Sequence, residues 1–134
     1  MHTQLYIHRD IKPVNFLTGR NNELNVLYLI DFGVAKRYKN PETKEHLAFK
    51  EGKRLTGTAD YCSISTHKGI EQSRRDDLEA MCYSIIQMLR GNLPWSKFSG
   101  KTMEEKFKKI MESKISSVPE KLCEGFSSTF TYHI

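Results

Sequence analysis

A polar motif near the start of the chain constrains its fold more than any other feature. The motif reads HRDIKPVNF over residues 8–16, and the triplet DFG follows at residues 31–33. Residues 14–30, which begin in the last part of the first motif and end just before DFG, hold two short apolar runs, VNFLT and NVLYLI, separated by the turn-forming residues GRNNE. Two apolar runs around such a turn are typical of a β-hairpin. We therefore predict a hairpin over residues 14–30, with one polar motif on each side of it.

The two motifs contain the residue types that phosphoryl transfer requires. This reaction needs a carboxylate to accept the proton of the substrate hydroxyl, cations to balance charge on the phosphoryl group, and oxygen ligands for Mg²⁺. Asp10 supplies the base, Lys12 supplies a cation, and Asn15 with Asp31 supplies the ligands. The alternative is coincidence, in which HRD is a surface triplet and DFG a turn. Chance would give this spacing about once in millions of windows, so we prefer the phosphoryl-transfer site.

The remainder of the chain predicts a long connection and then helices. Residues 31–73 are rich in turn formers, and a connection of this length is usually functional. Ser73 and Asp76 form a capping box and Gly91 can end a helix, which predicts a helix over residues 73–91. Apolar residues at helical spacing predict that this helix is largely buried: Leu78, Met81, Cys82, Ile85, Ile86 and Leu89.

A second helix is predicted to begin at Thr102, with Glu105 in its cap. Pro119 lies beyond its expected end. The inward face is predicted to hold Phe107, Ile110 and Met111, and the outward face Lys106, Lys108 and Lys109.

Composition bounds the class of protein. At 134 residues, 38% hydrophobic and 28% charged, the chain is one globular domain or part of one. The net charge is +5, but the basic clusters are short and interrupted by acidic residues, which favours solvated surface over a binding site for nucleic acid. The run VLYLI at residues 26–30 is too short to span a membrane. The odd number of cysteines, with no C-x-x-C pair, favours a reducing cytoplasmic or nuclear compartment.

Four segments together are diagnostic of one protein family: YIHRDIKPVNFL, LIDFGVAKRY, LTGTADYCSISTHKGIEQSRRDDLEAM and GNLPW. Through these segments the chain resembles the casein kinase I family of serine/threonine protein kinases. SIS at residues 63–65 resembles the Ser-Ile-Asn that this family has where most kinases have Ala-Pro-Glu. The resemblance implies the mainly α-helical C-terminal lobe of the protein kinase fold, with a small β-hairpin and without the N-terminal lobe. It also implies a kinase that uses ATP and Mg²⁺.

The resemblance assigns roles to individual residues. Asp10 is the catalytic base, Lys12 steadies the γ-phosphate of ATP, and Thr58 matches the threonine that bonds both. Asn15 and Asp31 are the metal ligands and, with Lys12, the cofactor-binding residues. His8 and Asp77 are structural, Asp77 being the aspartate that anchors the HRD backbone. From the residues alone, Asp77 could instead be a solvated carboxylate favoured by the helix dipole.

Further roles concern anions and protein substrates. Arg9, Lys36 and Lys53 match basic residues that bind an anion beside the activation loop, although ordinary surface charge is the alternative. Lys106 matches a lysine that binds phosphorylated or acidic residues upstream of the target Ser or Thr. Asp60 stands where the family has the arginine of G-T-A-R-Y, which should weaken that preference.

Other departures concern Val14, Cys82 and what the chain does not contain. Val14 replaces an acidic residue beside the catalytic asparagine, and Cys82 replaces a helix glycine. No G-x-G-x-x-G occurs in residues 1–134. We therefore expect a partial kinase domain comprising the catalytic loop, the activation segment, helices F and G and the start of helix H, inactive alone. The alternatives are a non-catalytic kinase-like scaffold or regulatory protein and a basic nucleic-acid-binding domain.

Overall fold

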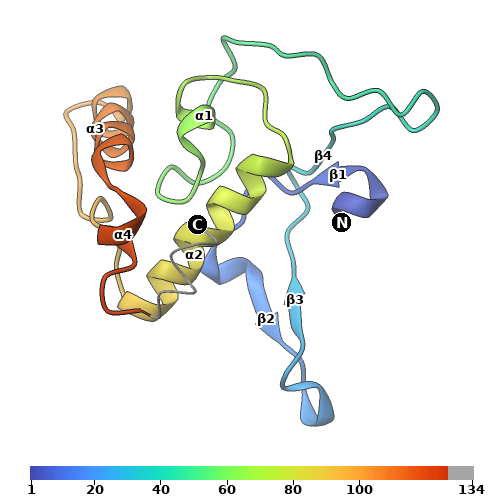
Figure 1. Cartoon of the computed structure of the whole chain (residues 1–134), viewed down its shortest axis with the longest axis horizontal. Coiled ribbons are helices and arrows are strands. Elements are labelled where there is room, and N and C mark those ends of the chain that lie inside the picture. Colours follow the sequence, from blue (N-terminus) through green and yellow to red (C-terminus); the bar gives the residue numbers. More distant parts are fainter. Residues whose placement is uncertain (127–134) are drawn as a thin grey trace.

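The computed structural model describes residues 1–126 of the chain (Figure 1). The strands are β1 (Tyr6–Ile7), β2 (Phe16–Thr18), β3 (Leu27–Leu29) and β4 (Lys36–Arg37), and the helices are α1 (Ile64–His67), α2 (Arg74–Arg90), α3 (Met103–Ser116) and α4 (Pro119–Leu122). Short 3₁₀ turns lie at His2–Gln4, Pro13–Asn15 and Asn21–Glu23. None of the helices in this part of the chain has the length and hydrophobicity needed to cross a bilayer.

The predicted hairpin is confirmed as the antiparallel pair β2–β3. Phe16 pairs with Leu29 and Thr18 with Leu27, and the hairpin extends away from the helices (Figure 1). A second antiparallel pair, β1–β4, was not predicted; it joins Tyr6 to Arg37 and Ile7 to Lys36. Each of these strands has two residues, too few to show an alternating pattern in the sequence. The described part of the fold therefore combines four helices with two small sheets rather than a single hairpin.

Both predicted helices are confirmed, with the expected residues at their ends. The Asp76 carboxylate accepts the Ser73 backbone N–H at 2.7 Å, which satisfies a donor that the first turn of α2 leaves free. Gly91 ends α2 with φ of 80°. At the start of α3, Thr102 Oγ1 accepts the Glu105 N–H at 3.1 Å, and the Glu105 carboxylate accepts the Lys101 N–H at 2.7 Å.

Helix α1 lies inside the stretch predicted as a loop. Ser63 caps it, because its hydroxyl oxygen accepts the Thr66 N–H at 3.0 Å. The same hydroxyl donates to Asp76 at 2.5 Å, and the Ile64 N–H donates to Glu79 at 2.9 Å. One turn of helix is too short to show a periodic pattern in the sequence, and its N-terminal end is held by these contacts with α2.

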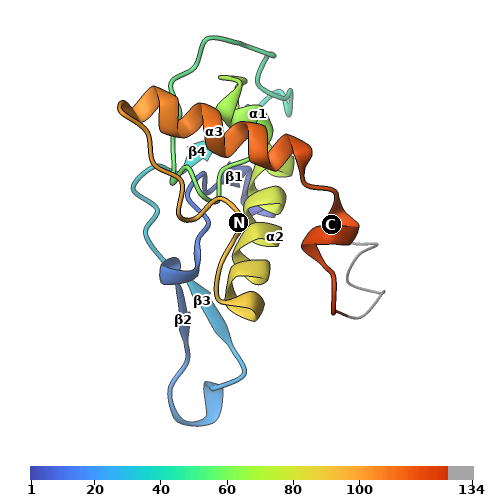
Figure 2. The same ribbon diagram turned by 90° about the vertical axis from the view of Figure 1, so that its left-hand side faces the viewer.

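The hydrophobic core lies where α3 and α4 meet one side of α2, with α3 crossing α2 (Figure 2). Trp95 is fully buried and meets the Tyr83 ring edge-on at 5.1 Å. The buried residues of this core are Tyr83, Ile86, Leu93, Trp95, Ile110, Leu122 and Cys123.

The prediction that α2 is largely buried is wrong for one of its faces. Ile86 is 0% exposed, but Leu78 is 60% and Leu89 58% exposed. The core occupies the side of the helix that carries Tyr83 and Ile86. On the other side Leu78 borders an open pocket that it shares with Met81, Leu29 and the first residues of the chain. The apolar stripe correctly predicted a helix. It did not predict how much of that helix is covered by other parts of residues 1–126.

His67, at the end of α1, is expected to make folding depend on pH. Its Nε2 lies 3.1 Å from the Ala59 carbonyl oxygen, and its ring meets Phe107 of α3 edge-on. Burial, with the charge of Lys114, lowers the pKa of His67 from 6.5 to about 4. Between pH 4 and pH 6.5, His67 binds a proton in the unfolded chain but stays neutral in the folded chain. The stability that neutral His67 contributes should therefore be fully present above pH 6.5 and be lost as the pH falls toward 4.

Protonation of His67 is expected to lower the free energy of unfolding by about 1 to 2 kcal/mol, after allowance for the partial exposure of this side chain. Urea unfolding of the wild-type chain and of His67→Gln at pH 7 and at pH 4.5 measures it, because Gln removes the titration and keeps a polar side chain. The variant should lose less stability than the wild type. His46→Gln, at an exposed histidine, is the control. Equal losses in wild type and His67→Gln would contradict the assignment.

Candidate active site

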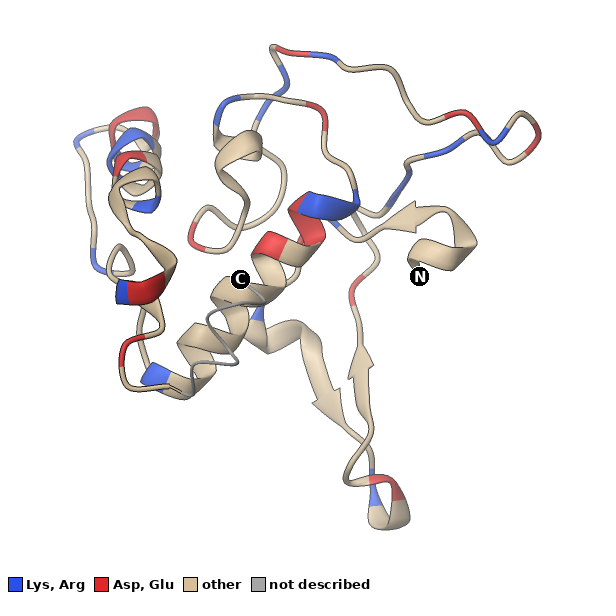
Figure 3. Cartoon of the chain, viewed as in Figure 1, with Lys and Arg blue, Asp and Glu red and all other residues tan. Residues whose placement is uncertain are grey.

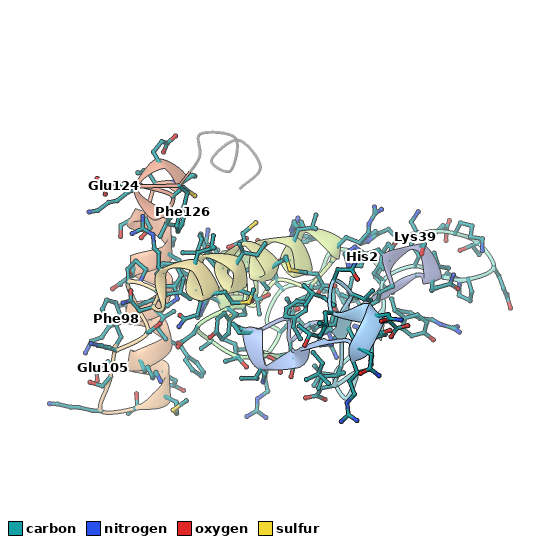
Figure 4. All side chains as sticks on the ribbon, turned by 90° about the horizontal axis from the view of Figure 1, so that it is seen from below. His2, Lys39, Phe98, Glu105, Glu124 and Phe126 are labelled. Atoms are coloured by element: carbon teal, nitrogen blue, oxygen red, sulfur yellow. The ribbon has the colours of Figure 1, made fainter. Side chains whose placement is uncertain are left out.

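Asp77, in the first turn of α2, holds the backbone of the HRD motif. Its carboxylate accepts the His8 N–H at 2.8 Å and the Arg9 N–H at 2.9 Å, and it lies 2.8 Å from His2 Nε2. His2 is labelled beside the N-terminal end of α2 in Figure 4. Asp77 is only 2% exposed, so it is not a solvated carboxylate. Arg9 has φ of 70°, a conformation that costs a non-glycine residue about 1 to 2 kcal/mol and that these bonds help to maintain.

Replacing Asp77 with Ala should destabilise the chain by about 3 to 5 kcal/mol. The change leaves the buried His8 N–H and the partly buried Arg9 N–H without their acceptor and removes a buried charge next to His2. Chemical denaturation measures the loss. Glu104→Ala, at an exposed acidic residue in the first turn of α3, should change stability by less than about 0.5 kcal/mol. A loss below 1 kcal/mol for Asp77→Ala would show that the HRD backbone does not depend on this carboxylate.

Asp10, Lys12 and Thr58 form a closed set of hydrogen bonds. Lys12 Nζ lies 2.7 Å from Asp10 Oδ2 and donates to Thr58 Oγ1 at 3.1 Å, while the Thr58 hydroxyl donates to Asp10 Oδ1 at 2.7 Å. Burial alone would raise the pKa of Asp10, but the bonds from Lys12 and Thr58 outweigh it and leave the pKa below its ordinary value. Asp10 is therefore ionised at neutral pH and able to accept a proton.

Gly57 allows the backbone before Thr58 to approach the HRD motif closely. Its φ is 96°, and a Cβ at this position would lie 2.3 Å from the Arg9 carbonyl oxygen. No side chain fits in this space, so only glycine lets the neighbouring Thr58 reach Asp10.

The hairpin register brings Asn15 and Asp31 to its open end. The Ile30 N–H donates to the Asn15 carbonyl at 2.9 Å, which continues the β2–β3 pairing by one step, so that Ile30 lies opposite Asn15 and Asp31 follows directly after Ile30. The Asn15 side-chain nitrogen donates to the Asp10 carbonyl at 2.9 Å, so its oxygen is the atom that remains for a cation. One carboxylate and one amide oxygen suit Mg²⁺, which keeps several waters and phosphate oxygens as its other ligands.

His8 connects the two polar motifs. It is fully buried, and its Nε2 lies 3.0 Å from the Ile30 carbonyl oxygen. Its ring meets Phe32 of the DFG triplet edge-on at 5.3 Å. The residue that opens the first motif thus contacts both flanks of Asp31.

Arg9, Lys36 and Lys53 line one pocket of about 190 Å³, together with Glu71. Lys36 Nζ lies 2.9 Å and Lys53 Nζ 3.5 Å from the Glu71 carboxylate. Burial alone would raise the pKa of Glu71, but Lys36 and then Lys53 lower it below its ordinary value. The three cations therefore meet, but one carboxylate already balances part of their charge. Sequence reasoning missed Glu71, because no spacing rule connects it to residues so far away in the chain.

Asp60 lies close enough to Lys106 of α3 for the two charges to act on each other. Helix α3 carries both acidic and basic residues (Figure 3). Burial raises the pKa of Asp60, and the charges of Lys106 and Lys114 oppose this rise. The Asp60 carbonyl accepts the indole N–H of Trp95 at 2.8 Å, which holds the backbone at this position.

The other two departures are structurally mild. Val14 is 73% exposed, and Cys82 is a half-buried free thiol on α2. Neither residue takes part in the hydrogen bonds that join Asp10, Lys12 and Thr58.

Comparison with known protein families agrees with this geometry. A family model described as the protein kinase domain matches residues 1–131. Because the match covers nearly the whole chain, the chain belongs to the protein kinase domain family. Members of this family are phosphotransferases, which generally use ATP and Mg²⁺.

Proposed function

We propose that the chain is the C-terminal, substrate-binding lobe of a serine/threonine kinase of the casein kinase I type. The observation that carries this proposal is the hydrogen-bonded set of Asp10, Lys12 and Thr58 beside the hairpin end that bears Asn15 and Asp31. In this assignment the catalytic loop and the activation segment precede helix F, which is α2. Helix G is α3, and α4 begins helix H.

Each residue of this set has a distinct task in transfer of the ATP γ-phosphate. Asp10 accepts the proton of the substrate hydroxyl as that oxygen attacks phosphorus. Lys12 balances negative charge on the transferring group, and Thr58 fixes the orientation of both side chains. Asn15 and Asp31 would hold Mg²⁺, which neutralises charge on the phosphates when ATP is bound.

The casein kinase I type rests on the segment that follows the activation loop. Its Ser63-Ile64-Ser65 sequence starts α1, and Ser63 and Ile64 bond to Asp76 and Glu79 of α2. The family resemblance places Ser-Ile-Asn at this point. Protein substrates would carry acidic or phosphorylated residues upstream of the target Ser or Thr. Arg9, Lys36 and Lys53 would bind an anion, and Lys106 would contact the substrate next to Asp60.

Residues 1–134 contain no Gly-rich loop to cover the phosphates. We therefore expect the isolated chain to transfer no phosphate and to show no saturable binding of Mg²⁺-ATP at micromolar concentration in calorimetry. A chimaera that places the N-terminal lobe of a protein kinase ahead of Met1 should phosphorylate casein. Its Asp31→Asn variant is the matched control for metal-dependent transfer.

Phosphoamino-acid analysis of the labelled casein tests the proposed specificity. Phosphoserine or phosphothreonine is expected, and no phosphotyrosine. A nucleotide-dependent thermal shift first shows that the chimaera is folded. A folded, nucleotide-binding chimaera without transfer would instead favour the non-catalytic scaffold.

A further inference from the structure

Lys114 of α3 is a buried lysine to which the proposed reaction gives no role. It is 2% exposed, and its ammonium lies 4.8 Å from the centre of the Tyr83 ring and 5.4 Å from that of Trp95. Lysine is almost never buried so completely, because its charge loses hydration. A methionine of similar length would fill this space without that cost, so the ammonium itself must contribute here.

The ammonium of Lys114 holds the turn that follows Thr58. Nζ donates to the Ala59 carbonyl at 2.8 Å and to the Cys62 carbonyl at 2.5 Å, and it lies 3.3 Å from His67 Nε2. Such bonds from a charged donor are about twice as strong as neutral ones. Burial lowers the pKa of Lys114 to about 8, which leaves it mainly protonated at pH 7.

Trp95 holds the same turn at a third carbonyl, that of Asp60. Within the turn, the N–H groups of Tyr61 and Cys62 donate to the Thr58 carbonyl at 3.0 and 2.9 Å. The turn is thus fixed by core side chains at one end, and at its other end the Thr58 hydroxyl reaches Asp10. Helix α3 packs against α1 beside this turn (Figure 2).

We propose that Lys114 is a positioning residue for Thr58: its ammonium holds the carbonyls of Ala59 and Cys62 so that the Thr58 hydroxyl meets Asp10. The consequence for catalysis rests on the proposed function, but the positioning itself does not. α3 thereby links the substrate side of the lobe to the catalytic base.

NMR on the labelled 134-residue chain tests this without any need for activity. In the wild type, side-chain couplings should show a single rotamer for Thr58. Lys114→Met should give averaged couplings at Thr58 and amide exchange at Cys62 faster by about tenfold, the loss expected for about one hydrogen bond. Thr66, which is 3% exposed and bonded to Ser63, should keep its rotamer. Lys114→Arg, which retains donors, should restore part of the order at Thr58, and Lys108→Met, at an exposed lysine of α3, should have no effect.

Two results would overturn the proposal. One is a single Thr58 rotamer in a folded Lys114→Met chain. The other is averaging at Thr58 and Thr66 together, which would show only a general loss of packing. If Lys114→Met does not fold, the wild type decides, through couplings across the hydrogen bonds from Lys114 Nζ to the carbonyl carbons of Ala59 and Cys62. Absence of these couplings, with an ammonium that exchanges freely with water, would refute the contact.

Discussion

Asp10→Asn is expected to lower kcat of the chimaera by about a thousandfold while KM for ATP changes little. A positioned general base contributes about 10² to 10⁴ in rate, and the amide that replaces it cannot accept the proton. The substitution preserves size and can still accept the Thr58 hydroxyl, so the fold should persist. Initial rates of casein phosphorylation at saturating ATP measure the effect.

The matched control for Asp10→Asn is Glu104→Gln, an equivalent change at an exposed residue on α3, which should leave kcat within about twofold. A nucleotide-dependent thermal shift equal to that of the parent chimaera shows that the variant is folded. If folded Asp10→Asn retains more than a tenth of the parent kcat, Asp10 is not the base and the assignment of the HRD motif is wrong.

Asp60→Arg is expected to raise the preference of the chimaera for phosphorylated substrates tenfold to a hundredfold. Asp60 lies near Lys106, and the two charges act on each other. Replacing repulsion with attraction toward a phosphate dianion at a partly exposed site is worth about 1 to 3 kcal/mol. The measurement is the ratio of kcat/KM for a phosphoserine-primed peptide to that for its unphosphorylated twin.

Asp60→Asn separates charge from shape in this experiment. It removes the negative charge without adding a cation, so its ratio should lie between those of the parent and of Asp60→Arg. With Asp, Asn or Arg at position 60, the indole N–H of Trp95 can still donate to the backbone carbonyl of that residue. A ratio that is already high with Asp60 and does not rise with Arg would show that this position does not contact the priming phosphate.

Local patterns predicted the hairpin and the two longer helices well. The turn residues between β2 and β3, the Ser73–Asp76 capping box and the Thr102 cap each act within a few residues, and each is visible in the sequence. Helix α1 and the β1–β4 pair were missed because they are very short and depend on contacts with distant segments.

Burial was predicted less well than helix formation. The stripe on α2 correctly includes Ile86 but also Leu78 and Leu89, which are exposed. Periodicity identifies an apolar face, but which part of it is covered depends on packing partners that no local pattern names.

In the candidate site, too, local spacing predicted some residues, while others meet only through tertiary folding. Spacing predicted Asp10, Lys12, Asn15 and Asp31, because the reaction needs these residue types in a fixed order. The sequence did not predict that Glu71 lines the pocket of Arg9, Lys36 and Lys53. It also did not predict that Lys114 bonds the turn that follows Thr58. A carboxylate that joins Lys36 to Lys53, and an ammonium that bonds two carbonyls more than fifty residues away, are products of tertiary folding.

In the proposed kinase, Asn15 and Asp31 should hold the metal of Mg²⁺-ATP while Lys12 and Asp10 face the transferred phosphate. The most direct measurement is a crystal structure of the chimaera with Mn²⁺ and a non-hydrolysable ATP analogue, with the metal located by anomalous scattering. We expect metal within about 2.3 Å of the Asn15 side-chain oxygen and of the Asp31 carboxylate, with Lys12 Nζ bonded to a γ-phosphate oxygen. Bound nucleotide whose metal touches neither Asn15 nor Asp31 would show that these residues are not the metal ligands.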